Sequence, residues 1–136
     1  MRRLGIDMGG RRTGVALSDP HGIICSPLEV IVETDREALF NRIIALIHLH
    51  EVDELVVGLP RPLGGGVNRQ LEKVLAFADT LQLRSGVKVN TWDERFTSKL
   101  ADKTGPKTGP RDAVAACYML QNYLDAQANA EVTGEQ

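Results

Sequence analysis

The sequence predicts an α/β fold of three layers built on one mixed five-stranded sheet. Alternating runs at residues 4–7 and 15–19 flank a Gly-rich turn, and a β-branched run follows at 23–32, which together predict a β-meander. The apolar spacing then changes to a helical period at 36–50 and again at 67–81. Two further apolar runs, 55–60 and 87–92, have the composition of parallel strands.

Turn and breaker residues mark the ends of the predicted elements. Asp19 and Pro20 are typical of a turn after the second strand, and Pro27 places the third strand at an edge or a bulge. Two Thr-Gly-Pro steps, at 104–106 and 108–110, should interrupt any helix before the last one, which is expected from about residue 111 to 125.

The order of these elements is a meander followed by right-handed crossovers, with residues 4–7 at the centre of the sheet. The strands at 55–60 and 87–92 should lie parallel beside this central strand. This layout is found in ribonuclease-H-like domains. We expect one such domain over residues 1–126 and a disordered tail over 127–136, which is small and polar.

Composition indicates an ordinary globular chain. Its 136 residues suit one domain with a real core, and no apolar run is long enough for a membrane span. Cys25 and Cys117 are far apart in the sequence and have no metal-ligand spacing, so we interpret them as buried apolar residues in a reducing compartment. A disulfide between them has no support in the sequence. We therefore expect a cytoplasmic protein.

Carboxylates stand at three places where ligands gather in such a sheet. Asp7 ends the first strand, Asp93 and Glu94 follow the fifth, and Asp112 opens the last helix. Carboxylates that converge repel each other, and the hard cations Mg²⁺ and Mn²⁺, which prefer oxygen ligands, relieve that repulsion. Two such ions can activate a water and stabilise the leaving oxygen in phosphodiester cleavage.

Each acid also has a purely structural interpretation. Asp7 could cap the Gly-rich turn through its own backbone, and Asp112 would complement the dipole in the first turn of a helix. Glu94 could form a surface ion pair with Lys99 or Arg95. Three acids at sheet-end positions together favour the metal site.

Positive charge is concentrated in two segments, although the net charge is −2. Basic residues recur every four positions through 95–111, and two more follow the first strand. These segments flank the acids and predict contacts with the phosphates of nucleic acid, the alternative being solvated faces. The residues expected at phosphates are Arg11, Arg12, Arg95, Lys99, Lys103, Lys107 and Arg111.

The motifs around the acids match a known family. They read GIDMG at 5–9, RTGVA at 12–16, VVGLP at 56–60, DERFTS at 93–98 and DAVAA at 112–116. Over residues 3–124 the chain resembles the YqgF family, also called RuvX, whose members are described as Holliday-junction resolvases and as pre-16S ribosomal RNA nucleases of bacteria.

The resemblance implies a ribonuclease-H-like fold and metal-dependent cleavage of nucleic acid, either precursor rRNA or branched or single-stranded DNA. It implies that Asp7, Glu94 and Asp112 are catalytic residues and ligands of Mg²⁺ or Mn²⁺. Asp93 is the alternative to Glu94 as the second acid, and Glu94 is preferred. A junction resolvase would also need a homodimer to make two symmetric cuts.

The chain departs from the family at 100–110, which is shorter than the lysine-rich stretch of most members and carries two prolines. This departure concerns the grip on substrate and leaves the acids intact. Two other functions compete with the nuclease. One is a non-catalytic RNA- or ribosome-binding module of the same fold. The other is an actin-like phosphate-binding domain, since an Asp-x-Gly-Gly turn also begins those proteins.

Overall fold

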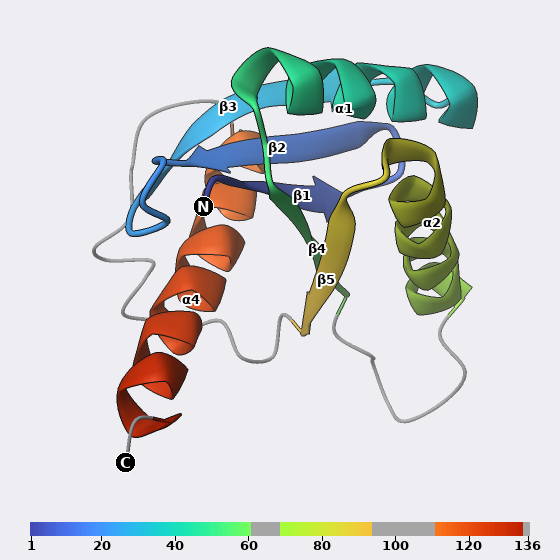
Figure 1. The fold of residues 1–136 in the computed structure, drawn as a ribbon. Coiled ribbons are helices and arrows are strands. Elements are labelled where there is room, and N and C mark those ends of the chain that lie inside the picture. Colours follow the sequence, from blue (N-terminus) through green and yellow to red (C-terminus); the bar gives the residue numbers. More distant parts are fainter. Residues whose placement is uncertain (61–68, 94–110, 135–136) are drawn as a thin grey trace.

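The computed structural model describes residues 1–60, 69–93 and 111–134, with side chains described as far as residue 130. Its strands form a single sheet in the order β3-β2-β1-β4-β5, so the predicted first strand is central (Figure 1). The strands are β1 (Arg3–Met8), β2 (Arg12–Ser18), β3 (Cys25–Val32), β4 (Glu54–Leu59) and β5 (Lys88–Asp93).

The pairing confirms the predicted mixed sheet. β1 and β2 are antiparallel, as are β2 and β3, whereas β1, β4 and β5 run parallel to one another. The carboxyl ends of the three parallel strands therefore lie at the same edge of the sheet. We call this the carboxyl edge; Met8, Leu59 and Asp93 are the last strand residues on it.

β3 is an edge strand, as Pro27 predicts. Pro27 is paired with Ala16 of β2, and the register of the two strands shifts between Val15 and Ala16. A proline has no N–H to donate, so an edge position next to an irregularity avoids the loss of a ladder hydrogen bond. The strand is shorter than predicted, because Ile23 and Ile24 lie before it and are 69% and 65% exposed.

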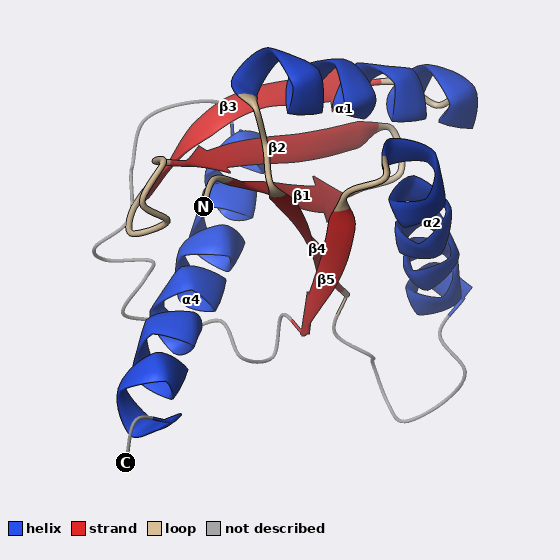
Figure 2. Ribbon diagram, in the orientation of Figure 1, coloured by secondary structure: helices blue, strands red, loops and turns tan. Residues whose placement is uncertain are grey.

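The helices cover both faces of the sheet and complete the three layers (Figure 2). α1 (Arg36–His50) and α2 (Arg69–Ser85) pack on one face, and α4 (Arg111–Gly134) packs on the other. The carboxylate of Asp35 caps α1 by accepting a hydrogen bond from the backbone N–H of Glu37. None of the described helices is long and apolar enough to cross a membrane.

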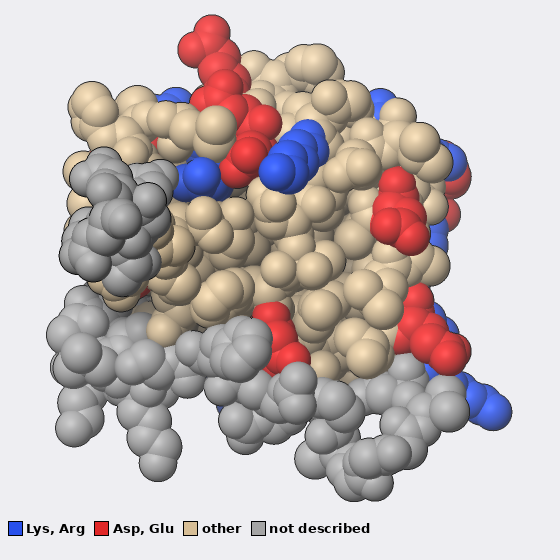
Figure 3. Space-filling model, turned by 60° about the horizontal axis from the view of Figure 1, so that its bottom comes forward, with Lys and Arg blue, Asp and Glu red and all other residues tan. Residues whose placement is uncertain are grey.

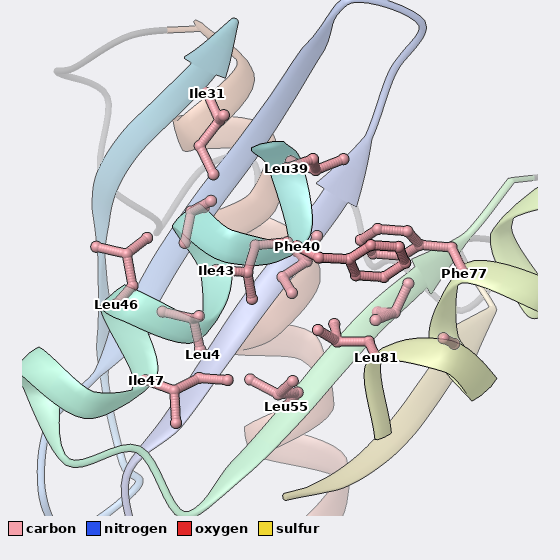
Figure 4. Close-up of a cluster of buried hydrophobic side chains, with 14 of the residues drawn as sticks. Leu4, Ile31, Leu39, Phe40, Ile43, Leu46, Ile47, Leu55, Phe77 and Leu81 are labelled. Carbon is pink, nitrogen blue, oxygen red and sulfur yellow. The ribbon is translucent and has the colours of Figure 1, made fainter. Parts of the chain in front are cut away.

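The larger core lies between the sheet and the pair α1 and α2 (Figure 4). Phe40 of α1 and Phe77 of α2 stack at its centre with ring centroids 4.7 Å apart. The guanidinium of Arg84 covers the outer face of Phe40 and forms two hydrogen bonds with Glu37. The aromatic pair thus joins the two helices that cross this face.

A second, smaller core lies under α4. It includes Ala116, Cys117 and Leu120 of the helix together with Ala16 and Cys25. The two cysteines are buried, as predicted, but they also touch, with 2.8 Å between their Sγ atoms. Their hydrogen bond and their burial raise the pKa of the Cys25 thiol well above its ordinary value. This thiol therefore stays protonated at neutral pH.

Two details of the helices differ from the sequence prediction. Leu75, which lies in the apolar run at 67–81 that predicts one buried helix face, is 40% exposed, whereas Phe77 is buried. α4 continues to Gly134, past the expected end near Asp125, because its residues 126–130 include three alanines and no helix breaker. The division into a domain at 1–126 and a tail at 127–136 stays a prediction.

Replacing Phe77 by Ala should lower the free energy of unfolding by about 3–5 kcal/mol, because it removes the ring that Phe40 stacks on and leaves a cavity. Leu83→Ala is the matched control on the same helix. Leu83 is 85% exposed, so its truncation should change stability by less than about 0.5 kcal/mol. Urea denaturation measures both, and equal values for the two variants would contradict this account of the core.

Candidate active site

Asp7 lies near the end of β1 on the face of the sheet that α4 covers. Leu4, Ile6 and Met8 of the same strand belong to the core under α1 and α2. Side chains alternate along a strand, so Gly5 and Asp7 face the other way. A Cβ built at Gly5 would lie 2.8 Å from Cβ of Leu120, which places α4 directly over this side of β1.

The closest approach of α4 to the sheet is at Gly14. A Cβ at this position would overlap the backbone carbonyl oxygen of Asp112 and lie 3.0 Å from the backbone nitrogen of Ala113. Gly14 is also the direct partner of Asp7 in the β1–β2 ladder. The same glycine thus touches the first turn of α4 and is the cross-strand neighbour of Asp7, which brings two of the three predicted acids together.

Arg12 is the basic residue of β2 next to this pair. It precedes Gly14 by two positions on the strand and therefore faces α4 as well. Its Nη1 lies 3.9 Å from Oδ2 of Asp112, and the two side chains are 67% and 39% exposed. An ion pair this long and exposed contributes at most about 1 kcal/mol. The guanidinium thus neutralises part of the acid charge and remains accessible to a ligand.

Asp93 occupies the carboxyl edge but faces the other side of the sheet. Val89 packs against the core under α1 and α2, and Trp92 packs against the core under α4. By strand alternation Asp93 shares the side of Val89. Asp93 and Asp7 therefore belong to opposite faces, although both stand near the ends of parallel strands.

Several predicted site residues lie outside the described part of the chain. They are Glu94, Arg95, Lys99, Lys103 and Lys107. Arg11, in the turn after β1, and Arg111, the first residue of α4, are exposed. Among the described residues no three His, Cys, Asp or Glu side chains form a group that could hold a metal. The described portion of the site is therefore the pair Asp7 and Asp112 with Arg12 beside it.

Charge on the surface is mixed where it is described. On the face drawn in Figure 3, acidic and basic side chains occur side by side and are separated by uncharged surface. The described part of this face thus forms no continuous basic patch. Attraction of a polyanion there would depend on individual cations.

Gly14 is the one residue of this site that the sequence analysis did not single out. A glycine inside a strand is a signal for close approach of another backbone, and that signal was present in the sequence. Which backbone approaches it could not be read, because Asp112 is far from Gly14 along the chain.

The comparisons with known proteins identify the family of this chain. Residues 1–126 match the family model described as RuvX, Holliday junction resolvase. A protein of Desulforudis audaxviator named "Putative pre-16S rRNA nuclease" is 40% identical over 98% of this chain and 100% of its own length. One of Desulforamulus reducens with the same name is 38% identical over 94% of this chain and 99% of its own.

Solved structures share the fold at low sequence identity. RuvC of Thermus thermophilus in complex with a Holliday junction substrate has a TM-score of 0.69, with 12% identity, over 94% of this chain and 96% of its own. The yeast mitochondrial resolvase Ydc2 has a TM-score of 0.59, with 10% identity, over 95% and 80%. These matches confirm the ribonuclease-H-like fold of the resolvases.

The fold therefore defines a chain of the ribonuclease-H-like class. The chain belongs to the RuvX family and is a nuclease of that family. The match extends over nearly the whole chain, so neither competing function gains support from the comparisons.

Replacing Gly14 by Ala should displace the first turn of α4, because the new methyl group would overlap the Asp112 carbonyl. We expect a loss of about 1–3 kcal/mol in stability and of roughly 100-fold in nuclease rate, since Asp112 moves relative to Asp7. Thermal melting and a cleavage assay measure the two effects.

Gly10→Ala is the stability control, because a Cβ at Gly10 would meet no atom within 4 Å. Its melting temperature should equal or slightly exceed that of the parent. A Gly14→Ala protein that melts and cleaves like the parent would contradict the importance of this contact.

Proposed function

We propose that this chain hydrolyses phosphodiester bonds of nucleic acid with a divalent cation, and that Asp7, Asp112 and Glu94 hold that cation. The observation that carries the proposal is the contact at Gly14, which joins the backbone of Asp112 to the strand position paired with Asp7. Two acids linked through one glycine, one on a strand and one on a helix, have no apolar packing role. Their arrangement suits a cation that prefers oxygen ligands.

The donor set fits Mg²⁺ or Mn²⁺. Carboxylate oxygens are the ligands these ions prefer, and the side chain of Asp112 is 39% exposed, which leaves room for water and a substrate phosphate. When bound, the ion lowers the pKa of a water and stabilises charge on the leaving oxygen. The carboxylates would hold the ion, and Arg12 offers the phosphate a guanidinium.

Glu94 is the better candidate for the third acid. Asp93 shares the face of Val89, away from α4, so its carboxylate is on the wrong side of the sheet to join Asp7 and Asp112. Glu94 is the other acid of this motif, and the resemblance to the family also favours it.

The names of the relatives point to pre-16S rRNA as the substrate, and we propose that the chain acts at its 5′ end, in the cytoplasm. The family description points instead to four-way DNA junctions. Cleavage of matched panels of precursor rRNA, single-stranded DNA, duplex DNA and a four-way junction separates these substrates. Paired symmetric cuts in the junction would further require a homodimer, which sedimentation would detect.

Cleavage should require a divalent cation that accepts near-octahedral oxygen coordination. We expect Mg²⁺ or Mn²⁺ to support it and Ca²⁺ to support it poorly, because Ca²⁺ binds in looser geometry and activates water less well. The measurement is the initial rate on a labelled RNA or DNA strand with each ion and with EDTA. Full activity in EDTA would overturn the proposal.

Replacing Asp7 or Asp112 by Asn should lower the cleavage rate by orders of magnitude and leave the fold intact. Each change removes one negative charge from a cluster that repels itself without metal, so melting in EDTA should occur at or above the parent temperature. Cleavage depends on the bound cation and should therefore be lost in both variants.

Asp19→Asn is the control. Its carboxylate accepts backbone hydrogen bonds from Ile23 and Ile24 in the loop before β3, which lower the pKa of Asp19. This loop follows β2 at the end of the sheet opposite the carboxyl edge and uses the acid structurally, so cleavage should stay near the parent rate. If Asp7→Asn melts far below the parent yet cleaves normally per folded molecule, Asp7 is a turn residue. If the parent binds nucleic acid but never cleaves it, the chain is the non-catalytic module.

A further inference from the structure

A pocket opens at the carboxyl edge on the face of the sheet opposite Asp7. Its volume is about 310 Å³, and its walls come from the end of β1, the start of α1 and the start of α2. Gly9 and Gly10 form the wall nearest the acids, and Arg36, Gln70 and Lys73 form much of the rest. We call it the α1–α2 pocket. It lies outside the group of acids described above.

The pocket is positively charged. Among the described residues that line it, Arg36 and Lys73 are the charged ones, and none of these residues is an acid. Within residues 1–60, 69–93 and 111–130, neither Arg36 nor Lys73 forms an ion pair. Glu37, the acid next to Arg36, is bound by Arg84 at 2.6 Å instead. Cζ of Arg36 lies 5.5 Å from the centre of the Phe77 ring, which holds the guanidinium over the core. Both side chains therefore line the open pocket with a positive charge that no described acid pairs with.

The turn between β1 and β2 separates this pocket from the acids, and two of its residues, Gly9 and Gly10, have no side chain. Gly9 is held in the turn by a hydrogen bond from its N–H to the carbonyl of Arg12, and a Cβ on it would lie 2.6 Å from that oxygen. A Cβ on Gly10 would meet no atom within 4 Å, so the crest of the turn is open. Gly9 and Gly10 follow Asp7 by two and three residues, directly after the end of β1, so Asp7 and the pocket lie on either side of the same short segment.

We propose that the α1–α2 pocket binds a backbone phosphate of the substrate strand next to the one at the acids. This rests on the proposed function. The strand crosses the bare turn at Gly9 and Gly10, and the flanking phosphate meets the guanidinium of Arg36 and the ammonium of Lys73.

A smaller, mostly apolar pocket of about 250 Å³ continues beyond the two cations. It shares Arg36 and Lys73 with the first pocket and is walled by Phe40, Ala76 and Phe77. A sugar or base attached to the bound phosphate has an apolar surface to contact there. The phosphate contacts carry no base information, so the site sets register and affinity without sequence preference.

Lys73→Gln tests the proposal in the full-length protein, with Lys88→Gln as the matched control. Lys88 begins β5 at the opposite edge of the sheet and is exposed. Binding of fluorescent single-stranded RNA and DNA, measured in EDTA over a range of salt, should weaken about fivefold for Lys73→Gln. The slope of log affinity against log salt should fall by about one. Lys88→Gln should match the parent in both.

Two further measurements separate this pocket from the catalytic acids. With Mn²⁺ and an oligonucleotide, Lys73→Gln should raise KM and keep kcat, because it removes a contact away from the reacting phosphate. With bis-p-nitrophenyl phosphate, which has a single phosphodiester, its rate should equal that of the parent. Gly10→Asp should also weaken oligonucleotide binding, because it places a negative charge on the open turn without steric conflict.

The outcomes distinguish the two proposals. Unchanged affinity, salt slope and KM for both Lys73→Gln and Gly10→Asp, with an active parent, would overturn the phosphate pocket alone. Equal weakening by Lys88→Gln would also overturn it, because the effect would then be general charge. A parent that neither binds nor cleaves any strand would overturn the proposed function and the pocket together.

Discussion

The contact between Gly14 and the first turn of α4 is the constraint on which the site depends. Asp112 belongs to a helix and Asp7 to a strand, and neither element positions the other by local geometry. They meet because a strand residue without a side chain lets the helix backbone rest on the sheet. Gly5 opposite Leu120 gives a second close approach further along the same helix. Two glycines thus set the depth at which α4 lies, and that depth sets the position of its acid.

At the carboxyl edge, the helices on the two faces of the sheet bring different charged residues together. On the side of α4 lie Asp7 and Asp112, which we propose to hold a cation. On the side of α1 and α2, Arg36 and Lys73 line an open pocket, which we propose to bind a phosphate. A phosphodiester strand bound with a metal offers both. With acids on one side of the β1–β2 turn and cations on the other, such a strand could cross the turn. The Phe40–Phe77 pair supports the cations, because Arg36 lies over the Phe77 ring.

The packing also explains why the large core and the site are separate. The stacked rings and the leucines of α1 and α2 stabilise the sheet from one side, and α4 covers the other through a smaller core in which its Cys117 touches Cys25 of β3. A small contact surface lets a helix approach the sheet closely. This close approach places Asp112, on the first turn of α4, against Gly14 of β2. The larger buried cluster thus lies on the face that does not carry the acids.

The sequence alone determined the element order, the mixed sheet, the edge position of β3 and the family, because each follows from local periodicity, from Pro27 or from motifs. It also named Asp7 and Asp112. It preferred Glu94 to Asp93 through the resemblance alone, and only the packing of β5 shows that Asp93 shares the face of Val89, away from α4. It did not show that Cys25 and Cys117 touch, or that Gly14 meets Asp112. Nor did it show that Arg36 and Lys73 share a pocket with Gly9 and Gly10. These pairs are distant along the chain, and only the packing of helices across the sheet brings them together.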